Sequence, residues 1–270
     1  MSYKIVFSDI DGTLLNLNRE LSPATITAVK RLKDKVPFVL ISARMPTAMR
    51  HLQKQLAIEH LPIICYNGGL IIADNRIVQS TVIPLQILEE LVKFNENLNC
   101  HLSLYHNEEW YVPQIDEWAQ REINNTKINP EVRSNSLVLS NWREEEKGAH
   151  KIMAMGDKNK INRIADFLTA SFNDKLHLYR SKDTYLEIAS KEISKFSAID
   201  FLLKEHFEFS VEQAVAFGDN YNDVEMLNKI GYGVAVGNAR PEAREVANAI
   251  VGESIEDGVA LFLQEIFPNR

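Results

Sequence analysis

The sequence predicts an α/β protein in which a parallel sheet carries a second, inserted α/β domain. Short apolar segments alternate with amphipathic helical segments towards both ends of the chain, as they do in parallel α/β sheets. Two of the apolar segments, residues 3–7 and 214–217, lead directly into closely spaced carboxylates. Between them, from about residue 84 to 189, the order of the predicted elements changes, which indicates an inserted layer rather than a continued sheet.

The N-terminal elements are predicted from apolar runs and turn residues. Ser22 and Pro23 suit the N-cap and first turn of a helix, since apolar residues follow them at helical spacing. Asp74 and Asn75 are expected to join two strands into a hairpin. The elements expected between these points are a strand over 36–41, a helix over 46–57, a strand over 61–66 and hairpin strands over 70–73 and 76–81.

The inserted segment begins near Pro84 with a long amphipathic helix over 85–98. The elements expected after it are strands over 101–105 and 110–112, a helix over 117–124, a polar connection, a strand over 151–155, a helix over 160–171 and strands over 176–180 and 185–189. We therefore predict that residues 84–189 form an inserted domain, and that 1–83 and 190–270 form the main domain.

The bulk composition is that of an ordinary globular protein. The 270 residues allow one or two domains, and 45% of them are hydrophobic and 25% charged. The net charge of −7 argues against a protein that binds the nucleic acid backbone, which requires a basic face. Cys65 and Cys100 form no motif, and Cys65 is expected to be a small buried hydrophobe in a reducing compartment. No apolar run approaches the ~20 residues that span a membrane, and the first residues hold a strand and a motif rather than a signal peptide, so we expect a cytoplasmic protein.

The first acidic cluster follows the strand at residues 3–7 in the order Asp9-Ile10-Asp11-Gly12-Thr13-Leu14. Ligands of open α/β sheets bind at the carboxyl ends of strands, and Gly12 allows a sharp turn there. Two like charges this close are costly unless a cation, a proton or the partners of a phosphate compensate them. The alternative is that Asp9 and Asp11 only start a turn and cap a helix.

The second acidic cluster, Gly218 to Asp223, also lies between an apolar strand and a helical pattern. Asp219 is expected at the strand end, while Asn222 and Asp223 open the helix towards the same crevice. Hard carboxylate and carbonyl oxygens suit Mg²⁺, which keeps several waters and is shared with a substrate phosphate. Alone, this cluster could be a helix cap rich in Asn and Asp; together, the two clusters predict a magnesium site.

Four blocks in this order resemble those of the haloacid dehalogenase (HAD) superfamily phosphatases, in the Cof-type branch with a large α/β cap. The blocks are the first acidic cluster, Leu40-Ile41-Ser42-Ala43-Arg44, Lys195 with Ala198 before a helix, and the second acidic cluster. The chain departs from the branch at three points. It has Ser42-Ala43 where Thr-Gly is more usual, Phe196 where the branch often has Gly, and Gly69 where Ala is common. The resemblance implies a Rossmann-like HAD core over 1–83 and 190–270, and a cap over 84–189 that selects the substrate.

The resemblance also implies a role for each candidate residue. Asp9 is the implied nucleophile that forms an aspartyl-phosphate, and Asp11 the implied acid and base, so their environments should push their pKa values apart. The implied Mg²⁺ ligands are Asp9, the backbone carbonyl of Asp11, and Asp219. Asp223 is implied either as a further ligand or as a residue that holds the ligands in place without binding the metal itself. The implied phosphate-binding residues are Ser42, Lys195 and Asn222.

Several of these residues have plainer alternatives. Lys195 could be a solvated lysine at a helix start, Ser42 a helix cap, and Arg44 either a phosphate contact or a structural partner for an acid. Asn67, followed by two glycines, is expected in a turn bordering the site. The remaining candidates either line a substrate pocket in the cap, or are the ordinary packing residues and exposed polar residues of a hairpin; they are His101, Tyr105, His106 and Trp110.

We therefore predict a Mg²⁺-dependent phosphatase that hydrolyses small phosphorylated metabolites. A sugar phosphomutase using the same intermediate and a non-catalytic sensor of a phosphorylated ligand are the alternatives. A dinucleotide-dependent dehydrogenase is excluded because the first strand leads into no G-x-G-x-x-G turn. Sugar phosphates, phosphorylated vitamins and nucleotides all stay open as substrates, as does the oligomeric state.

Overall fold

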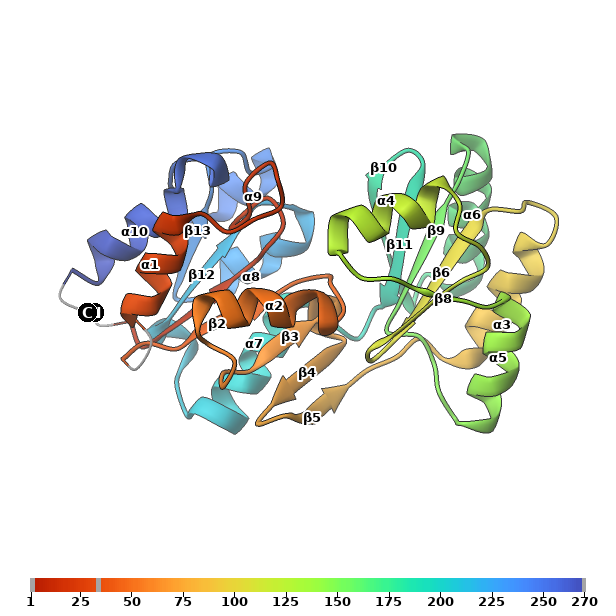
Figure 1. Ribbon diagram of the computed structural model, residues 1–270, viewed down its shortest axis with the longest axis horizontal. Coiled ribbons are helices and arrows are strands. Elements are labelled where there is room, and N and C mark those ends of the chain that lie inside the picture. The colour runs from red at the N-terminus through yellow and green to blue at the C-terminus, as the bar shows by residue number, and fades with distance from the viewer. Residues whose placement is uncertain (1–2, 33–34, 269–270) are drawn as a thin grey trace. The chain divides into compact units, whose positions relative to one another are not determined.

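The structure is a computed structural model that describes residues 3–32 and 35–268. The chain divides into two compact units (Figure 1). Unit 1 comprises Met1–Arg44, Met49–Val78 and Ser194–Arg270, and unit 2 comprises Met45–Ala48 and Gln79–Ile193. Both units are α/β, so the predicted fold class is confirmed.

Unit 1 is built on an eight-stranded sheet over the described residues, in the order β14-β13-β12-β1-β2-β3-β4-β5. The strands from β14 to β3 are parallel, and β4 runs antiparallel to β3. Their bounds are β1 Ile5–Ser8, β2 Phe38–Ile41, β3 Ile63–Cys65, β4 Leu70–Ala73, β5 Arg76–Ser80, β12 Ala214–Gly218, β13 Tyr232–Ala235 and β14 Ala249–Ile250.

The central strand β1 determines where the site lies. All four of its residues are buried, as is usual for a strand covered on both faces of a parallel sheet. It pairs with β12 on one side and β2 on the other, so the carboxyl ends of these three strands are neighbours. The residues that follow these ends are therefore brought to one edge of the sheet.

Four helices connect consecutive parallel strands of unit 1: α1 Pro23–Leu32, α2 Thr47–Leu56, α8 Val224–Lys229 and α9 Pro241–Val246. Two further helices are α7 Lys195–Leu202, which precedes β12, and α10 Gly258–Ile266, which follows β14. Helices α1 and α10, from opposite ends of the chain, lie side by side (Figure 1). Ser22 caps α1 as predicted, since its Oγ accepts a hydrogen bond from the Thr25 N–H at 3.0 Å. The β4–β5 hairpin is also confirmed, with Asp74 and Asn75 at φ of 51° and 59°.

Unit 2 holds a six-stranded sheet within the described part of the chain, in the order β10-β11-β9-β6-β7-β8. Helices α3, α5 and α6 cover one face of it around a single apolar core (Figure 1). The strands are β6 His101–His106, β7 Glu109–Val112, β8 Glu131–Val132, β9 Lys151–Met155, β10 Leu176–Lys182 and β11 Tyr185–Ser190. The helices are α3 Leu85–Asn95, α4 Glu117–Thr126, α5 Asn135–Glu144 and α6 Lys158–Phe172.

The predicted polar connection before residue 151 is wrong, because the structure contains β8 and α5 there. Helix α5 buries three side chains, Val138, Leu139 and Trp142, while most of its other positions are polar. Ser134 caps the helix through its side-chain oxygen. The narrow apolar stripe of α5 packs against β7 and α3, so tertiary contacts rather than a strong local pattern stabilise it.

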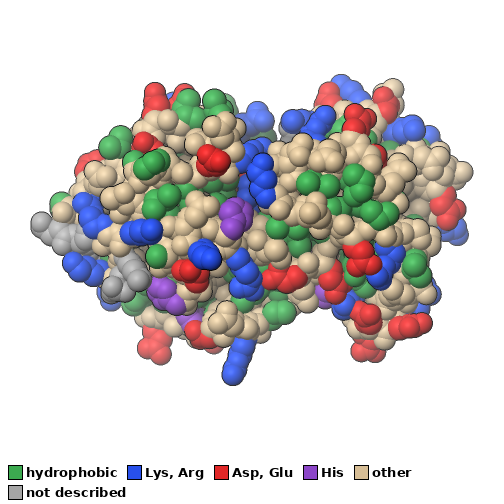
Figure 2. All heavy atoms as spheres, viewed as in Figure 1, with side chains coloured by type: hydrophobic (Ala, Val, Ile, Leu, Met, Phe, Trp, Pro, Cys, Tyr) green, Lys and Arg blue, Asp and Glu red, His purple; other side chains and the backbone are tan. Residues whose placement is uncertain are grey.

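The surface and the cysteines agree with the bulk composition. Acidic and basic side chains are interspersed over the face seen in Figure 2. Cys65 is fully buried, as predicted, and Cys100 is buried as well. None of the helices in 3–32 and 35–268 combines the length and the apolar character that crossing a membrane requires.

Candidate active site

The two acidic clusters meet at the carboxyl ends of β1 and β12. Asp9 follows β1, and Asp219 follows β12, its neighbour in the sheet. Gly12 has φ of +86°, and a Cβ there would lie 2.4 Å from Asp219 Oδ2. Thr13 Oγ1 donates a hydrogen bond to Asp219 Oδ1 at 3.2 Å. The turn of the first cluster therefore packs directly on the second, and only glycine leaves room for that approach.

Lys195 lies between two of the carboxylates. Its Nζ donates to Asp9 Oδ1 at 2.5 Å and to Asp223 Oδ1 at 2.6 Å, and its side chain is fully buried. It is the first residue of α7 rather than preceding that helix, and Ser194 caps the helix by accepting from the Ser197 N–H at 3.1 Å. An ammonium group has three donors, so one remains for a further acceptor after these two bonds. The alternative of a solvated lysine is wrong for this residue.

Asp223 anchors the second acidic cluster. While its Oδ1 accepts from Lys195, its Oδ2 accepts from the backbone N–H groups of Asp219 and Asn220, at 2.9 and 3.0 Å. Both oxygens therefore already have donors. This arrangement fixes the loop after β12 and holds Lys195 in place. It favours Asp223 as a residue that supports the metal ligands rather than one that binds the metal directly.

The cluster carries more negative charge than its own cation balances. One carboxylate oxygen each from Asp9, Asp219 and Asp223 lies within 4.8 Å of the others, while Lys195 supplies one ammonium. Asp9 Oδ2 is buried and has no hydrogen-bond partner among the described residues. A buried, unpartnered carboxylate oxygen beside two further carboxylates is what a hard divalent cation such as Mg²⁺ fits. The residues present therefore suit the predicted metal.

The charge excess is reflected in the pKa values of the clustered acids. Burial raises the pKa of Asp9 well above its ordinary value; the Lys195 charge opposes this rise, and Asp223 and Asp219 add to it. Burial, followed by the Asp223 charge, raises the pKa of Asp219 to about 7. Without a bound cation, the folded protein therefore favours proton uptake at this cluster.

Asp11 lies in the opposite environment. Arg44 binds it through two bonds, Nε to Oδ2 and Nη2 to Oδ1, both 2.7 Å long, and Arg19 Nη1 binds Oδ1 at 2.6 Å. Burial acts to raise the pKa of Asp11, but the hydrogen bonds and charges of the two arginines outweigh it and lower that pKa. The environments of Asp9 and Asp11 push their pKa values apart, but without a bound cation Asp11 is the more readily ionised acid, which is the reverse of the order that a charged nucleophile Asp9 and a protonated Asp11 require.

Of the alternatives left open for Arg44, the structure favours a partner for an acid, and that acid is Asp11. Arg19 lies in the exposed loop closed by the Leu15–Leu21 bridge and belongs to no motif, so no signal in the sequence pointed to it. The same loop and residues 253–255 line a pocket of about 450 Å³ that reaches Asp11.

Ser42 and Asn222 lie at the same edge of the sheet. Ser42 is buried after β2, and its Oγ accepts from the Arg44 N–H at 3.2 Å. It does not cap α2, which begins at Thr47. Asn222 Nδ2 donates to Asn67 Oδ1 at 2.9 Å, and Asn67 lies in the turn after β3, as predicted. A phosphate-binding role for Ser42, Lys195 and Asn222 stays a prediction.

The aromatic and histidine residues singled out in unit 2 make local contacts. His101 Nδ1 is 2.8 Å from Asp116 Oδ2, and Asp116 also caps α4. His106 Nδ1 donates to the Gly148 carbonyl at 2.7 Å. The Tyr105 and Trp110 rings stack with centroids 5.5 Å apart. These contacts favour the packing alternative, but the two histidines are buried, so the expectation of exposed polar residues is wrong for them.

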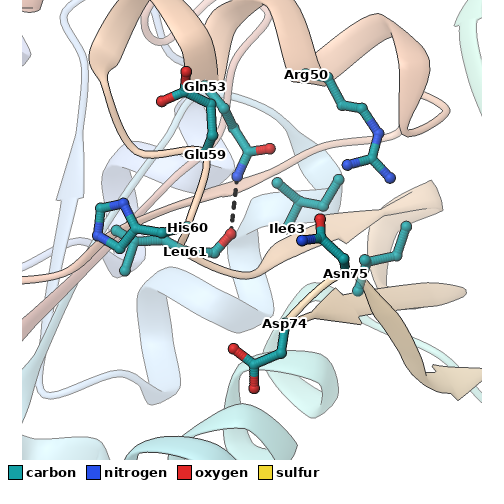
Figure 3. A pocket seen from close by; sticks show the side chains of 9 residues that line it. Arg50, Gln53, Glu59, His60, Leu61, Ile63, Asp74 and Asn75 are labelled. Carbon is teal, nitrogen blue, oxygen red and sulfur yellow. Dashed lines mark hydrogen bonds between the residues drawn. The ribbon is translucent and has the colours of Figure 1, made fainter.

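A second pocket of unit 1, of about 300 Å³, lies between α2, the loop before β3 and the β4–β5 turn (Figure 3). Gln53 braces that loop, since its Nε2 donates to the Leu61 carbonyl at 3.0 Å. Arg50 and Asn75 extend over the same hollow (Figure 3). Its lining contains none of the predicted site residues among those described.

Comparison with known proteins assigns the family. A family model described as haloacid dehalogenase-like hydrolase matches residues 6–263. A Haemophilus influenzae protein named as a candidate phosphatase is 35% identical over 273 residues, covering 100% of both chains. The pyridoxal phosphate phosphatase of Escherichia coli is 24% identical over 278 residues, covering 97% of this chain and 98% of its own. A haloacid dehalogenase-like hydrolase from Bacteroides thetaiotaomicron superposes with a TM-score of 0.90 at 26% identity, covering 98% of this chain and 100% of that one.

The fold of this chain is thus shared with a haloacid dehalogenase-like hydrolase, and the family model of the same description covers most of the chain. The chain belongs to the haloacid dehalogenase-like hydrolase family, and it is a phosphatase of that family. The resemblance drawn from the four sequence blocks is confirmed.

Proposed function

We propose that this phosphatase hydrolyses small phosphorylated metabolites with Mg²⁺, through a phosphoryl group carried on Asp9. The observation that carries the proposal is the buried, unpartnered Oδ2 of Asp9, beside the Lys195 ammonium and two further carboxylates. Burial desolvates this carboxylate and raises its pKa, so a bound cation is needed to keep it charged. Such a carboxylate is a nucleophile towards phosphorus once its charge is compensated.

In the first half-reaction, an Asp9 oxygen attacks phosphorus, and the bond from phosphorus to the leaving oxygen breaks. The proton that this oxygen needs comes from Asp11. In the second half, water attacks the phosphoryl group, Asp11 takes the proton of that water, and Asp9 is released with free phosphate. The lowered pKa of Asp11 suits the base of the second half, in which the carboxyl must be ionised, but it opposes the first half, in which Asp11 must hold a proton.

Lys195 and Asn222 are the proposed contacts to the phosphoryl oxygens. Lys195 has a third donor beyond its bonds to Asp9 and Asp223, and the Asn222 amide has a second N–H beyond its bond to Asn67. Ser42 adds a hydroxyl at the same strand edge. Positioning and countercharge of this kind supply most of the rate enhancement in phosphoryl transfer.

Mg²⁺ would be held by Asp9, Asp219 and the backbone carbonyl of Asp11. Asp223 would support these ligands without binding the metal itself. When bound, the cation supplies positive charge that keeps Asp9 ionised and offsets the charge of the phosphoryl group. Asp223 keeps the loop after β12 and Lys195 in place.

The proposed substrates are small phosphomonoesters selected by unit 2, which we propose acts as the cap. Relatives of this chain are named for pyridoxal phosphate and for 5-amino-6-(5-phospho-D-ribitylamino)uracil, and the latter, from Bacillus subtilis, is 27% identical over 273 residues. These names support metabolites rather than macromolecules as substrates. The absence of a nucleic acid partner and a cytoplasmic location stay predictions.

The test is the release of inorganic phosphate from a panel of phosphorylated metabolites, with Mg²⁺, with EDTA, and with Asp9→Asn. We expect release that requires Mg²⁺ and is lost in Asp9→Asn, while Asp74→Asn, in the exposed β4–β5 turn, is unaffected. Isomerised substrate without free phosphate would instead identify a mutase. Ligand binding without turnover by folded, Mg²⁺-loaded protein would identify a sensor.

A further inference from the structure

The turn after β3 has an unusual backbone for its sequence. Tyr66, Asn67 and Gly68 have φ of 52°, 56° and 106°, so three consecutive residues lie in the left-handed region. Glycine adopts this region freely and asparagine tolerates it, but a bulky residue such as tyrosine rarely does. Strain of this kind persists only where surrounding contacts fix the backbone, and it concentrates at functional sites.

Contacts on every side fix this turn within unit 1. The Tyr66 and Asn67 N–H groups donate to the Arg44 and Ser42 carbonyls, at 3.1 and 2.9 Å. A Cβ at Gly68 would lie 2.6 Å from the Ser194 carbonyl oxygen, at the start of the helix that begins with Lys195. The turn thus joins the segment after β2 to the N-terminus of α7.

The Asn67 side chain extends this connection to the second acidic cluster. It is buried, and its Oδ1 accepts from Asn222 Nδ2 at 2.9 Å. Asn67 follows β3 and Asn222 follows β12, which are separated in the sheet by β1 and β2. Three strand spacings amount to about 14 Å, so the two loops must lean towards each other over the ends of β1 and β2. Asp9 and Ser42 follow those two strands.

The bond also determines which way the Asn222 amide faces. An amide can present either its NH₂ group or its carbonyl oxygen, and its partners decide between the two. Because Asn67 Oδ1 is an acceptor, it keeps the Asn222 nitrogen on its own side, where the second N–H is a donor. Without that acceptor, the amide is free to rotate and present oxygen, which repels a phosphoryl oxygen.

We propose that Asn67 is a positioning residue for the phosphatase reaction, holding the Asn222 amide with its N–H available to the substrate phosphoryl group. This inference rests on the proposed function and adds a residue to its site. Asn67 does not itself touch the substrate; it acts through Asn222. Asn67 reaches Asn222 from this left-handed turn, so the strained turn has a role in the proposed site.

The test is a double-mutant cycle between Asn67→Gly and Asn222→Ala, read by the affinity for orthovanadate in the presence of Mg²⁺ and by kcat and KM. Glycine tolerates the φ of Asn67, so we expect Asn67→Gly to fold with a melting temperature close to that of the wild type. We expect each variant to bind vanadate about tenfold more weakly, the loss of one well-oriented hydrogen bond, and the double variant to be no weaker than Asn222→Ala. Asn75→Gly, the same change at φ of 59° in the β4–β5 turn, is the matched control and should bind as the wild type.

A second variant leaves the strained turn untouched. Asn222→Asp presents only acceptors, so vanadate should bind it more weakly than Asn222→Ala. The inference is overturned if Asn67→Gly binds vanadate like the wild type, if the two single losses multiply in the double variant, or if Asn222→Asp binds as well as Asn222→Ala. A wild-type protein that neither releases phosphate nor binds vanadate would overturn the proposed function itself, and this inference with it.

Discussion

Replacing Asp219 by asparagine should stabilise the metal-free protein. Burial and the Asp223 charge raise the pKa of Asp219 to about 7, whereas an aspartate in an unfolded chain has a pKa of about 3.9. Because the folded-state pKa is the higher one, the folded protein holds the proton more tightly than the unfolded chain. Ionisation of Asp219 therefore lowers the free energy of unfolding as the pH rises from about 4 to about 7, and the full loss is present above pH 7.

The expected magnitude follows from this difference in pKa. A difference of about three units at about 1.4 kcal/mol each gives a free energy of unfolding about 4 kcal/mol higher in Asp219→Asn than in the wild type at pH 8 in EDTA. The asparagine keeps an oxygen for the Thr13 hydroxyl, which lies 3.2 Å from the carboxylate. Near pH 4 the two proteins should differ by less than about 1 kcal/mol, because the wild-type carboxyl is then protonated in the fold.

The assay is urea unfolding across pH 4 to 8 in EDTA, repeated with Mg²⁺. Asp200→Asn is the control, since Asp200 forms an exposed pair with Lys204 at 2.7 Å and its loss should change stability by less than about 1 kcal/mol. Mg²⁺ should stabilise the wild type and not Asp219→Asn. A variant less stable than the wild type at pH 8 in EDTA, or a difference that does not shrink towards pH 4, would refute the reasoning.

Three further predictions follow from the same contacts. Lys195→Met leaves two buried carboxylates without their ammonium, so the free energy of unfolding in EDTA at pH 8 should fall by about 3–5 kcal/mol. A loss below about 1 kcal/mol, measured by urea unfolding, would contradict the proposed charge balance. Gly12→Ala places a Cβ 2.4 Å from a carboxylate oxygen and should abolish the rise in melting temperature with Mg²⁺, whereas Gly252→Ala, with its nearest neighbour at 3.5 Å, should retain it. Arg44→Gln removes a bidentate partner and raises the pKa of Asp11, so the pH below which phosphate release declines should move upward; an unmoved acid limb counts against Asp11 as the base.

The arrangement of the acidic clusters was predictable from sequence because it depends on short-range patterns. Each cluster directly follows a buried apolar strand, and parallel strands place their carboxyl ends at one edge of a sheet. This is how Asp9 and Asp219 come together although they are far apart in the chain. Their roles in the reaction stay predictions.

Other features depend on contacts that no local pattern encodes. Helix α5 has a narrow apolar stripe and takes its stability from packing on unit 2. Arg19 reaches Asp11 from an exposed loop, and the Asn67–Asn222 bond joins residues 155 positions apart. The sequence around Asn67 predicted a turn, but the partner of its side chain depends on how two loops lean over the sheet. The lowered pKa of Asp11 likewise follows from two arginines that only the fold brings together.

The most direct test of the central claim is to look for the phosphoryl group on Asp9 itself. Protein mixed with a substrate identified in the metabolite panel and Mg²⁺ would be quenched in acid within one turnover, digested, and fragmented by mass spectrometry. We predict a phosphoryl group on Asp9 that is absent from Asp9→Asn and from the EDTA sample. Phosphate release with no labelled Asp9 at any quench time, or a label that persists in Asp9→Asn, would contradict the account.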